Sequence, residues 1–556
     1  MHSWLRHTRR VSALAFGTAL ATTLSNGPAP AVLNAQLREQ AEQAAPQDRA
    51  DSLAGQADRF SHAAIKFTPC QQNTSLDCGT LFVPVDYAKP YGERVGIAVI
   101  RARATKPAER IGVIVGNPGG PGISGVDFVL NGINVPAFAR LRERFDVVSF
   151  DPRGVGRSRP VSCTADYPDP PADLDTADDA TLAAYFDEVG RVFAKACVEQ
   201  NGPWVTHLGT NDVARDIDML RRALGERQIT YAAGSYGSEL GATYASLFPE
   251  RLRAMLLDGT VTPMHRDYLV EFVSEFSTAF EHSFRRLDQL CRRDPACRLA
   301  DTGVVAAFDD IAAQLKDAPV TSPTGTVLTK ASFADIVAVL LDRESFLPLI
   351  VTALANAKAG DFGLLFQLAP IASDGDPSAL YAITCNDYGT RRPAADYLPI
   401  DEAVGSLNSR FFGRFFVASK VSICSAWAPA DPPVIRDVRK RVRTPILIIG
   451  NDFDSRTPLS SARRLADTLG MERSLVRYTG GGHTAFAKTT ACIQETIESY
   501  LFDLRVPEEG FACPGRVISF GPSLQRSTSD ALPGGDASPD FWGAPPVPRG
   551  LPSRAR

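Results

Sequence analysis

Strand-like and helix-like segments alternate in two distant parts of this 556-residue chain. In the first part, the apolar runs 229–233 and 252–257 flank a segment of helical spacing, 236–248. In the second part, the strand-like runs 445–449 and 474–478 alternate with segments of helical spacing, 459–469 and 484–501. Strands that alternate with helices form a mostly parallel sheet covered by helices on both faces. The sequence therefore predicts an α/β fold.

The remaining patterns set the expected domain limits. Four strand-like runs and one amphipathic helix precede the first alternation, at residues 81–85, 96–103, 111–115, 145–150 and 210–224. Between about 263 and 440, apolar residues recur mostly at helical spacing. We interpret residues 263–440 as a helical cap inserted over the carboxyl edge of the sheet. The expected core then comprises residues 67–262 and 441–513.

Three terminal segments are expected to lie outside this core. Residues 1–35 are interpreted as an export signal, because three arginines precede the apolar run 11–24 and small residues follow it. The alternative is an amphipathic helix of the folded domain. Residues 36–66 are rich in Ala, Gln and charges and predict a loosely held leader. The Pro-, Gly- and Ser-rich residues 514–556 predict a disordered tail.

Ten cysteines support export independently of the signal. An even number favours disulfides in a secreted protein, and ten buried thiols in a cytosolic protein are the alternative. Two pairs are close enough in sequence to close small loops and three more are natural partners, although the sequence does not fix the connectivity: Cys70/Cys78 and Cys291/Cys297, then Cys163/Cys197, Cys385/Cys424 and Cys492/Cys513. No cysteine has the spacing of a zinc site. We expect an exported protein, periplasmic or extracellular.

The charge balance excludes some partners. The chain has 59 Lys and Arg against 63 Asp and Glu, a formal net charge of −4, and no long basic run. Such a balance argues against nucleic acid as the partner. No internal stretch reaches the roughly 18–20 unbroken apolar residues of a membrane span, so no stable membrane insertion is expected after signal removal.

A serine follows the strand-like run 229–233, and a helix begins directly after it. The sequence Ala233-Gly-Ser235-Tyr-Gly237 fits the G-x-S-x-G nucleophile elbow, with Ala233 at the first small position. Small residues two before and two after the serine leave room for the sharp turn that lifts its hydroxyl above the sheet. The alternative is a Gly-Ser turn in which Ser235 caps the helix. Ser235 is the candidate nucleophile.

A serine nucleophile needs an adjacent base, and the chain has only seven histidines. His483 follows three glycines after the last strand-like run and precedes the final helix, where a catalytic histidine of this topology lies. Asp454, in the loop after the strand-like run 445–449, is the candidate acid that orients it. Asp452 in the same loop and Asp258 after an earlier run remain alternatives.

Glycines also mark a loop suited to binding an oxyanion. The segment 116–122, Gly-Asn-Pro-Gly-Gly-Pro-Gly, follows the strand-like run 111–115. Because glycine lets a backbone N–H approach a substrate oxygen closely, we expect one N–H from Gly119 or Gly120 to act with that of Tyr236. A phosphate-binding loop is the alternative, but no Gly-Lys-Ser/Thr follows.

With these residues in view, residues 67–514 resemble the secreted tripeptidyl aminopeptidases, α/β-hydrolases related to prolyl aminopeptidases. The resemblance rests on seven segments: 78–87, 116–122, 150–158, Ser235-Tyr-Gly with 240–245, 454–458, Gly482-His483 and Cys492/Cys513. It implies an α/β-hydrolase fold, a helical cap that limits access and the release of short peptides or residues from free N-termini. The chain departs from the family at Ala233 and at Ser455-Arg456, where the family more often has Pro-Val.

These observations predict an exported serine hydrolase in which His483 accepts the proton of Ser235 and an acyl-enzyme forms, without a metal or an organic cofactor. The expected substrate is a peptide with a free amino terminus. A carboxylesterase acting on a small ester is the alternative, and a non-catalytic binding protein of the same fold is the third possibility. Four acids are candidates for holding a substrate ammonium, although each also fits a structural role: Glu239, Glu271, Glu275 and Asp387.

Overall fold

The computed structural model describes residues 46–58, 64–171, 177–261, 268–372, 376–388, 391–402, 410–411, 416–486 and 490–521. All of them belong to the compact unit Ala45–Arg556. The other unit, Met1–Ala44, lies outside the described residues, as does most of the tail. The signal peptide and the disordered tail therefore stay predictions.

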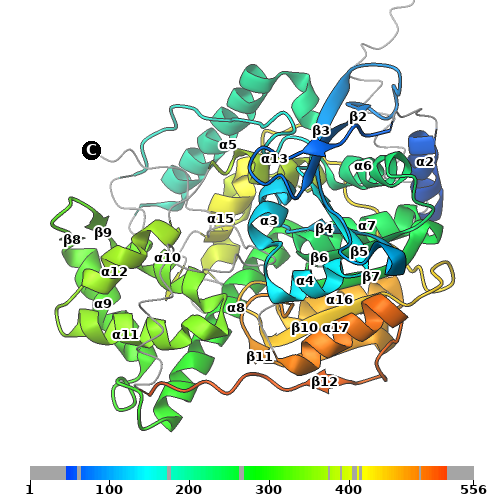
Figure 1. Ribbon diagram of the computed structural model, residues 1–556. Helices are drawn as coiled ribbons and strands as arrows, with labels where there is room; N and C mark the ends of the chain where they lie inside the picture. The colour runs from blue at the N-terminus through cyan, green and yellow to red at the C-terminus, as the bar shows by residue number, and fades with distance from the viewer. Residues whose placement is uncertain are drawn as a thin grey trace, which may run out of the picture. The chain divides into compact units, whose positions relative to one another are not determined.

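A sheet of ten strands, counted over the described residues, forms the centre of this unit (Figure 1). Its order is β1-β2-β3-β5-β4-β6-β7-β10-β11-β12. The strands are β1 (Thr68–Pro69), β2 (Asp77–Pro84), β3 (Arg94–Ala102), β4 (Gly112–Asn117), β5 (Phe145–Phe150), β6 (Ile229–Ser235), β7 (Leu252–Thr260), β10 (Leu447–Phe453), β11 (Leu475–Gly481) and β12 (Ala512–Cys513). From β5 to β12 all neighbours are parallel, and β1 to β3 extend the sheet in antiparallel pairing. The predicted α/β class is confirmed.

The central strands are apolar because both of their faces are covered. Every residue of β4 and of β6 is buried, and β7 is buried except at Arg253. Parallel strands between two layers of helices have no solvent-facing side, so they appear in the sequence as continuous apolar runs. The antiparallel strands β2 and β3 instead contain exposed or partly buried positions between buried ones.

Helices lie on both faces of the sheet (Figure 1). On one face, α6 and α7 pack against each other, and α7 also packs against β6 and β7. On the other face lie α3, α4 and α17, where Arg140 of α4 pairs with Glu498 of α17 at 3.3 Å. The helices of the core and its leader are α2 (Pro46–Asp58), α3 (Gly125–Gly132), α4 (Pro136–Arg142), α5 (Asp179–Asn201), α6 (Thr210–Ala223), α7 (Tyr236–Leu247), α16 (Leu459–Leu469) and α17 (Ala491–Asp503).

The described residues between β7 and β10 are mainly helical, and we call this segment the cap. Its helices and its small hairpin are α8 (Tyr268–Arg293), α9 (Val304–Asp317), β8 (Val320–Thr321), β9 (Val327–Leu328), α10 (Lys330–Leu341), α11 (Leu347–Lys358), α12 (Gly363–Leu368), α13 (Ser378–Asp387) and α15 (Phe416–Val421). The apolar periodicity of residues 263–440 therefore predicted the type of structure. The exact domain limits stay a prediction.

The leader differs from the expectation of a loosely held segment. Residues 46–58 form α2, which packs against α6 and α7 and buries Ala50 and Ala57 completely. An ion pair between Arg49 and Asp431, 2.6 Å long, also holds this helix. Among residues 49–57 of this helix, Leu53 is the one large apolar side chain that packs against the core and most of the others are small or polar, which is why the sequence shows no apolar period there.

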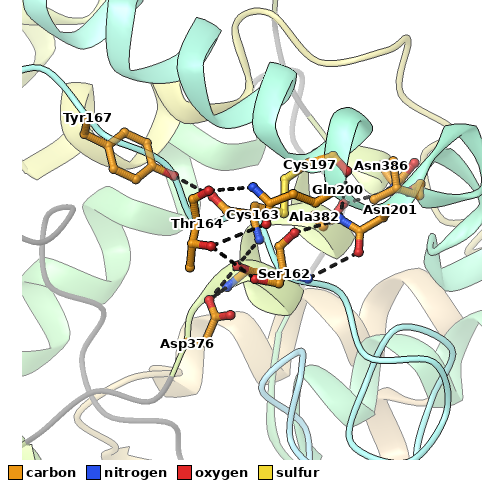
Figure 2. The surroundings of a disulfide bond; sticks show 12 residues. Ser162, Cys163, Thr164, Tyr167, Cys197, Gln200, Asn201, Asp376, Ala382 and Asn386 are labelled. Atoms are coloured by element: carbon orange, nitrogen blue, oxygen red, sulfur yellow. Dashed lines mark hydrogen bonds between the residues drawn. A yellow bond between two sulfur atoms is a disulfide. The ribbon is translucent and has the colours of Figure 1, made fainter.

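All five expected disulfides are present: Cys70–Cys78, Cys163–Cys197, Cys291–Cys297, Cys385–Cys424 and Cys492–Cys513. Figure 2 shows the surroundings of Cys163–Cys197, which joins the segment after β5 to α5. The backbone N–H of Cys163 also donates to Ser378 Oγ at the start of α13, at 2.8 Å. This disulfide therefore sits where the core contacts the cap.

Candidate active site

Ser235 occupies a strained turn between β6 and α7. Its backbone has φ 54° and ψ −134°, a conformation that L-residues rarely adopt. A helix-capping serine has an extended backbone and accepts an N–H with its side chain, but Ser235 makes no capping hydrogen bond to α7. The capping alternative therefore does not describe this residue, and the strained turn is the geometry of a nucleophile elbow.

The elbow is packed so tightly that two of its neighbours have room only for small side chains. A Cβ at Gly237 would lie 2.8 Å from Asn117 Oδ1 and 2.9 Å from the Cβ of Ala233. Ala233 itself fits, so this departure from the G-x-S-x-G pattern is accommodated. Ser235 is 8% exposed, which leaves its hydroxyl side only narrowly open to solvent.

The glycine loop after β4 lies directly against the elbow. A Cβ at Gly119 would lie 2.8 Å from Gly234 O, 3.1 Å from Ser235 Cβ and 3.3 Å from Tyr236 N. Only glycine permits this approach, and its φ of +95° also favours glycine. The backbone N–H of Gly119 donates to Asn117 Oδ1 at 2.9 Å, so this donor is already used within the loop. The sequence analysis did not assign a role to the buried Asn117.

Asp454 and His483 meet at the carboxyl ends of β10 and β11. His483 Nδ1 lies 2.9 Å from Asp454 Oδ1, and both side chains are completely buried. Because a carboxylate can only accept, Nδ1 carries the proton and Nε2 is the basic nitrogen. Thr457 Oγ1 lies 3.3 Å from the same Nδ1. The imidazole orientation is thus set from two sides.

The Asp454 carboxylate is held in its charged form. Burial alone would raise its pKa, but His483 and the backbone N–H groups of Thr457 and Arg456, each donating at 2.8 Å, keep the pKa below its ordinary value. A third backbone N–H, from Thr484, donates to Oδ2 at 3.1 Å. A fully ionised carboxylate beside the imidazole is what a triad acid requires.

The two alternative acids have other partners. Asp452 forms a two-pronged ion pair with Arg477, with both N–O distances 2.6 Å. Asp258 accepts the backbone N–H groups of Ala485 and Phe486, at 2.9 Å and 2.7 Å, and so fixes the chain just beyond the histidine. Of the three aspartates, Asp454 is the one whose carboxylate the structure places on His483 Nδ1.

The end of β7 joins the serine side of the site to the acid side. Ser235 pairs in register with Thr260 of β7. A Cβ on the preceding Gly259 would lie 2.8 Å from Thr484 Cγ2 and 3.2 Å from Asp454 Oδ2. Gly259, with φ +58°, thus lets the acid and histidine loops lie against the strand beside the elbow. No sequence motif had marked this glycine.

The final helix begins later than the sequence suggested, and this matters for the histidine. The pattern predicted a helix from 484, whereas α17 starts at Ala491. His483 is followed by Thr484 with φ +62°, a conformation that a helix does not contain. The hydrogen bonds of Asp258 and Asp454 to the backbone of 484–486 compete with helix formation there.

Two of the four acids considered for a substrate ammonium form a buried cluster beside the elbow. Burial raises the pKa of Glu239 to about 8, although it accepts a hydrogen bond from Tyr388. Burial and the nearby Glu239 also raise the pKa of Asp387 well above its ordinary value. Asp387 accepts from the N–H and the hydroxyl of Thr210, both at 2.6 Å. The cluster thereby connects the cap to the helix that follows Ser235.

A third acid from that set, Glu275, pairs with Arg464 and accepts from Ser461 Oγ at 3.0 Å, so it has protein partners. Over the described residues, no group of three or more His, Cys, Asp or Glu side chains could hold a metal ion. Within the same residues, none of the helices combines the length and the apolar character of a membrane span.

The fold and the elbow define an α/β-hydrolase, and the comparison with protein families agrees. Residues 112–488 match the model of the alpha/beta hydrolase fold family. The chain therefore belongs to this family.

Curated relatives place the chain among its serine hydrolases. It is 30% identical to a tripeptidyl aminopeptidase of Streptomyces lividans, over 82% of this chain and 88% of that protein. It is 29% identical to the serine protease Hip1 of Mycobacterium tuberculosis, over 81% of this chain and 91% of that protein. Carboxylesterase B of Mycobacterium tuberculosis is 31% identical, over 78% and 86% respectively. The chain is thus a serine hydrolase of the tripeptidyl aminopeptidase-like group, as its motifs predicted.

Proposed function

We propose that the protein is an exported peptidase that releases short peptides from free N-termini, with Ser235, His483 and Asp454 as its catalytic triad. The main observation that supports this triad is the 2.9 Å contact between His483 Nδ1 and Asp454 Oδ1, at the sheet edge where the strained Ser235 also lies. The similarity to a tripeptidyl aminopeptidase supports the substrate class.

In the proposed reaction, His483 Nε2 takes the hydroxyl proton of Ser235 as Oγ attacks the substrate carbonyl. Asp454 holds the imidazole and stabilises the imidazolium that forms. The imidazolium then protonates the leaving amine as the carbon–nitrogen bond breaks. Water, deprotonated by the same imidazole, hydrolyses the acyl-enzyme and restores Ser235.

The oxyanion would be bound by the backbone N–H groups of Tyr236 and Gly120. Of the two glycines considered, Gly119 gives its N–H to Asn117, which favours Gly120 as the donor. Gly119 contributes instead by having no side chain, so that the loop can approach Tyr236 N.

Labelling with a fluorophosphonate probe tests the nucleophile. The wild-type protein should become covalently labelled, and the Ser235→Ala variant should not. The control is Ser75→Ala, because Ser75 is an exposed serine between β1 and β2 whose hydroxyl binds Asn73. An absence of labelling in folded wild-type protein would support a binding protein of the same fold.

Three substrates separate the peptidase from the carboxylesterase that a second relative suggests. These are a tripeptide amide with a free amino terminus, the same compound N-acetylated, and a short acyl ester. We expect the free tripeptide to have the highest kcat/KM. Equal turnover of the free and the acetylated tripeptide contradicts the aminopeptidase assignment, and preferred turnover of the ester favours the esterase.

Export is the second part of the proposal. Five disulfides that close small and medium loops favour an oxidising compartment. N-terminal sequencing of protein recovered from the periplasm or the medium should find a start close to residue 35. Full-length protein that stays in the cytosol with free thiols contradicts export.

A further inference from the structure

A short segment of the cap forms hydrogen bonds with both loops that carry the proposed acid and base. This segment comprises residues 342–344, directly after α10. We call residues 454–457 the acid loop and residues 481–483 the histidine loop. Asp342 is 3% exposed and Glu344 is 6% exposed, so both carboxylates are buried at this contact. Buried carboxylates require partners, and each finds them in these loops and in the elements beside them.

Asp342 binds both loops at once. Its Oδ1 accepts from Ser455 Oγ at 2.6 Å and its Oδ2 accepts from Arg456 Nε at 2.8 Å, both in the acid loop. Its backbone carbonyl accepts the backbone N–H of His483 at 2.9 Å. One cap residue therefore holds the neighbours of Asp454 and the backbone of His483.

Glu344 holds the residue at the other end of the histidine loop. Its Oε1 accepts from the N–H of Gly481 at 2.7 Å and from Arg286 of α8 at 2.8 Å. Its Oε2 accepts from the hydroxyl of Tyr478 at 2.8 Å. The contact is also close between backbones, because a Cβ at Gly482 would lie 2.8 Å from the carbonyl oxygen of Asp342.

The Asp342 carboxylate binds Ser455 and Arg456, two of the residues at which the chain departs from the family it resembles. Arg456 is 5% exposed, and its guanidinium lies over the rings of Phe276 and Phe280, 5.7 Å and 5.6 Å from their centres. In this apolar setting its charge needs a counter-ion, and Asp342 supplies it. The Arg456 backbone N–H meanwhile donates to Asp454. The side chain and the backbone of Arg456 thus link Asp342 to the proposed catalytic acid.

We propose that Asp342 is a positioning residue of the reaction, which couples the cap to Asp454 and His483 through Ser455, Arg456 and its own carbonyl. This rests on the proposed function. When the contact is lost, the substrate still binds, but the imidazole is less well aligned with Ser235. A misplacement of about 1 Å can cost roughly 100-fold in rate, so kcat changes and KM does not.

Kinetics of a free tripeptide substrate with full-length variants test the proposal. Asp342→Ala should lower kcat by about 10- to 100-fold while KM stays within about twofold. Asp342→Asn, which keeps the shape and an acceptor for Ser455, should retain more activity than Asp342→Ala. The control is Asp310→Ala, since Asp310 is an exposed cap acid that pairs with Lys358 of α11, and this variant should match the wild type.

The pH dependence of kcat/KM distinguishes positioning through the charge pair of Asp342 and Arg456 from a non-specific loss of order in the acid and histidine loops. The charged groups around His483 are Asp454, Asp258, Asp342, Glu344, Arg286 and Arg456. Asp342→Asn leaves the Arg456 charge uncompensated, which disfavours the imidazolium and moves the acid limb to lower pH. Arg456→Met leaves the Asp342 charge uncompensated, which favours the imidazolium and moves the acid limb of kcat/KM to higher pH. In the double variant, the acid limb should lie close to its wild-type pH.

Failure of this inference is distinguishable from failure of the proposed function. If wild-type protein neither turns over nor reacts with the fluorophosphonate, the proposed function fails. If the wild type is active, three results overturn the role of Asp342: a kcat within twofold of wild type in Asp342→Ala, a change in KM alone, or acid limbs that move in the same direction in Asp342→Asn and Arg456→Met. Where Asp342→Ala does not fold, the isosteric Asp342→Asn decides by the same criteria.

Discussion

The two halves of the candidate site are held in place by different means. The serine half, formed by the elbow and the glycine loop after β4, is positioned within the core by backbone packing. Gly119 and Gly237 have no room for a Cβ, and Ser238 Oγ joins the elbow to the end of β7 by donating to Ser235 O and accepting from Val261 N. The acid half is positioned by side chains of the cap, chiefly Asp342 and Glu344.

This difference separates the part of the site that is held within the core from the part that depends on the cap. The close contacts of the elbow and of Gly119 are made within β4, β6, β7 and their turns, and the cap reaches this half through the hydrogen bond of Tyr388 to Glu239. The acid half needs a contact across 113 residues between Ser455 and Asp342. We therefore expect changes at Asp342 and Glu344 to alter Asp454 and His483 while they leave the elbow intact.

The largest expected effect comes from the acid half. Asp454→Asn should lower kcat by roughly 10⁴-fold, because an amide favours the wrong imidazole tautomer and cannot stabilise the imidazolium. Asp452→Asn is the matched control two residues away. Its ion pair with Arg477, which is 51% exposed, should contribute little, so kcat should stay near the wild-type value. Steady-state kinetics of both purified variants tests this, and an Asp454→Asn variant with a nearly wild-type kcat would exclude Asp454 as the acid of the triad.

In the serine half, Gly119→Ala should lower kcat by about 10²- to 10³-fold, the usual loss of one oxyanion donor. The added Cβ would push the loop away from Gly234 O and Tyr236 N, so that the neighbouring N–H no longer faces the substrate oxygen. Gly360→Ala is the control: its φ is +88°, similarly strained for alanine, but nothing lies within 4 Å of the new Cβ. If both variants lose activity equally, the effect is on folding and the steric argument is wrong.

The same contrast explains how much of the site could be predicted from the sequence. Elements made by local patterns were found: the buried strands as apolar runs, the elbow as small residues around Ser235, and the five disulfides. The resemblance to a known family added the expected release of short peptides from free N-termini and the expectation that the cap limits access. Ser235 was assigned from its flanking residues, and the structure gives it the strained backbone that those residues permit.

Contacts between segments distant in sequence could not be predicted. Asp342 lies in an unremarkable stretch after an apolar helix, and nothing local shows that its partners are Ser455 and Arg456. The helix α2 was missed because its contact face contains one large apolar side chain, Leu53, among small and polar residues. The Gly119 N–H was a candidate donor until the structure placed Asn117 Oδ1 on it.

A smaller effect on kcat is expected when the disulfide at either end of the sheet is removed. Cys492–Cys513 ties α17 to β12, which pairs with β11 just before the histidine loop, and Cys70–Cys78 ties β2 at the opposite end. Replacing either pair by serines should lower the free energy of unfolding by about 2–4 kcal/mol. Only the Cys492/Cys513 variant should also lower kcat. Urea unfolding together with kinetics tests this, and equal kcat in both variants shows that β12 does not support the histidine.

The smallest predicted effect concerns Glu239, the buried acid beside the elbow in the serine half. The pKa of Glu239 is about 8 in the folded protein because of burial, against 4.5 for an ordinary glutamate. Between these pH values the unfolded chain has lost the proton that the folded chain keeps, so the free energy of unfolding falls as pH rises. Glu239→Gln keeps a group that can accept from Tyr388 and removes this titration. Its melting temperature should therefore fall less than that of the wild type between pH 5 and pH 8.

The control is Glu250→Gln. Glu250 is an exposed glutamate just after the same helix, and this variant should follow the wild type. If Glu239→Gln has the wild-type slope as well, the carboxyl ionises normally inside the folded protein, and the serine half carries a buried charge that its neighbours must stabilise.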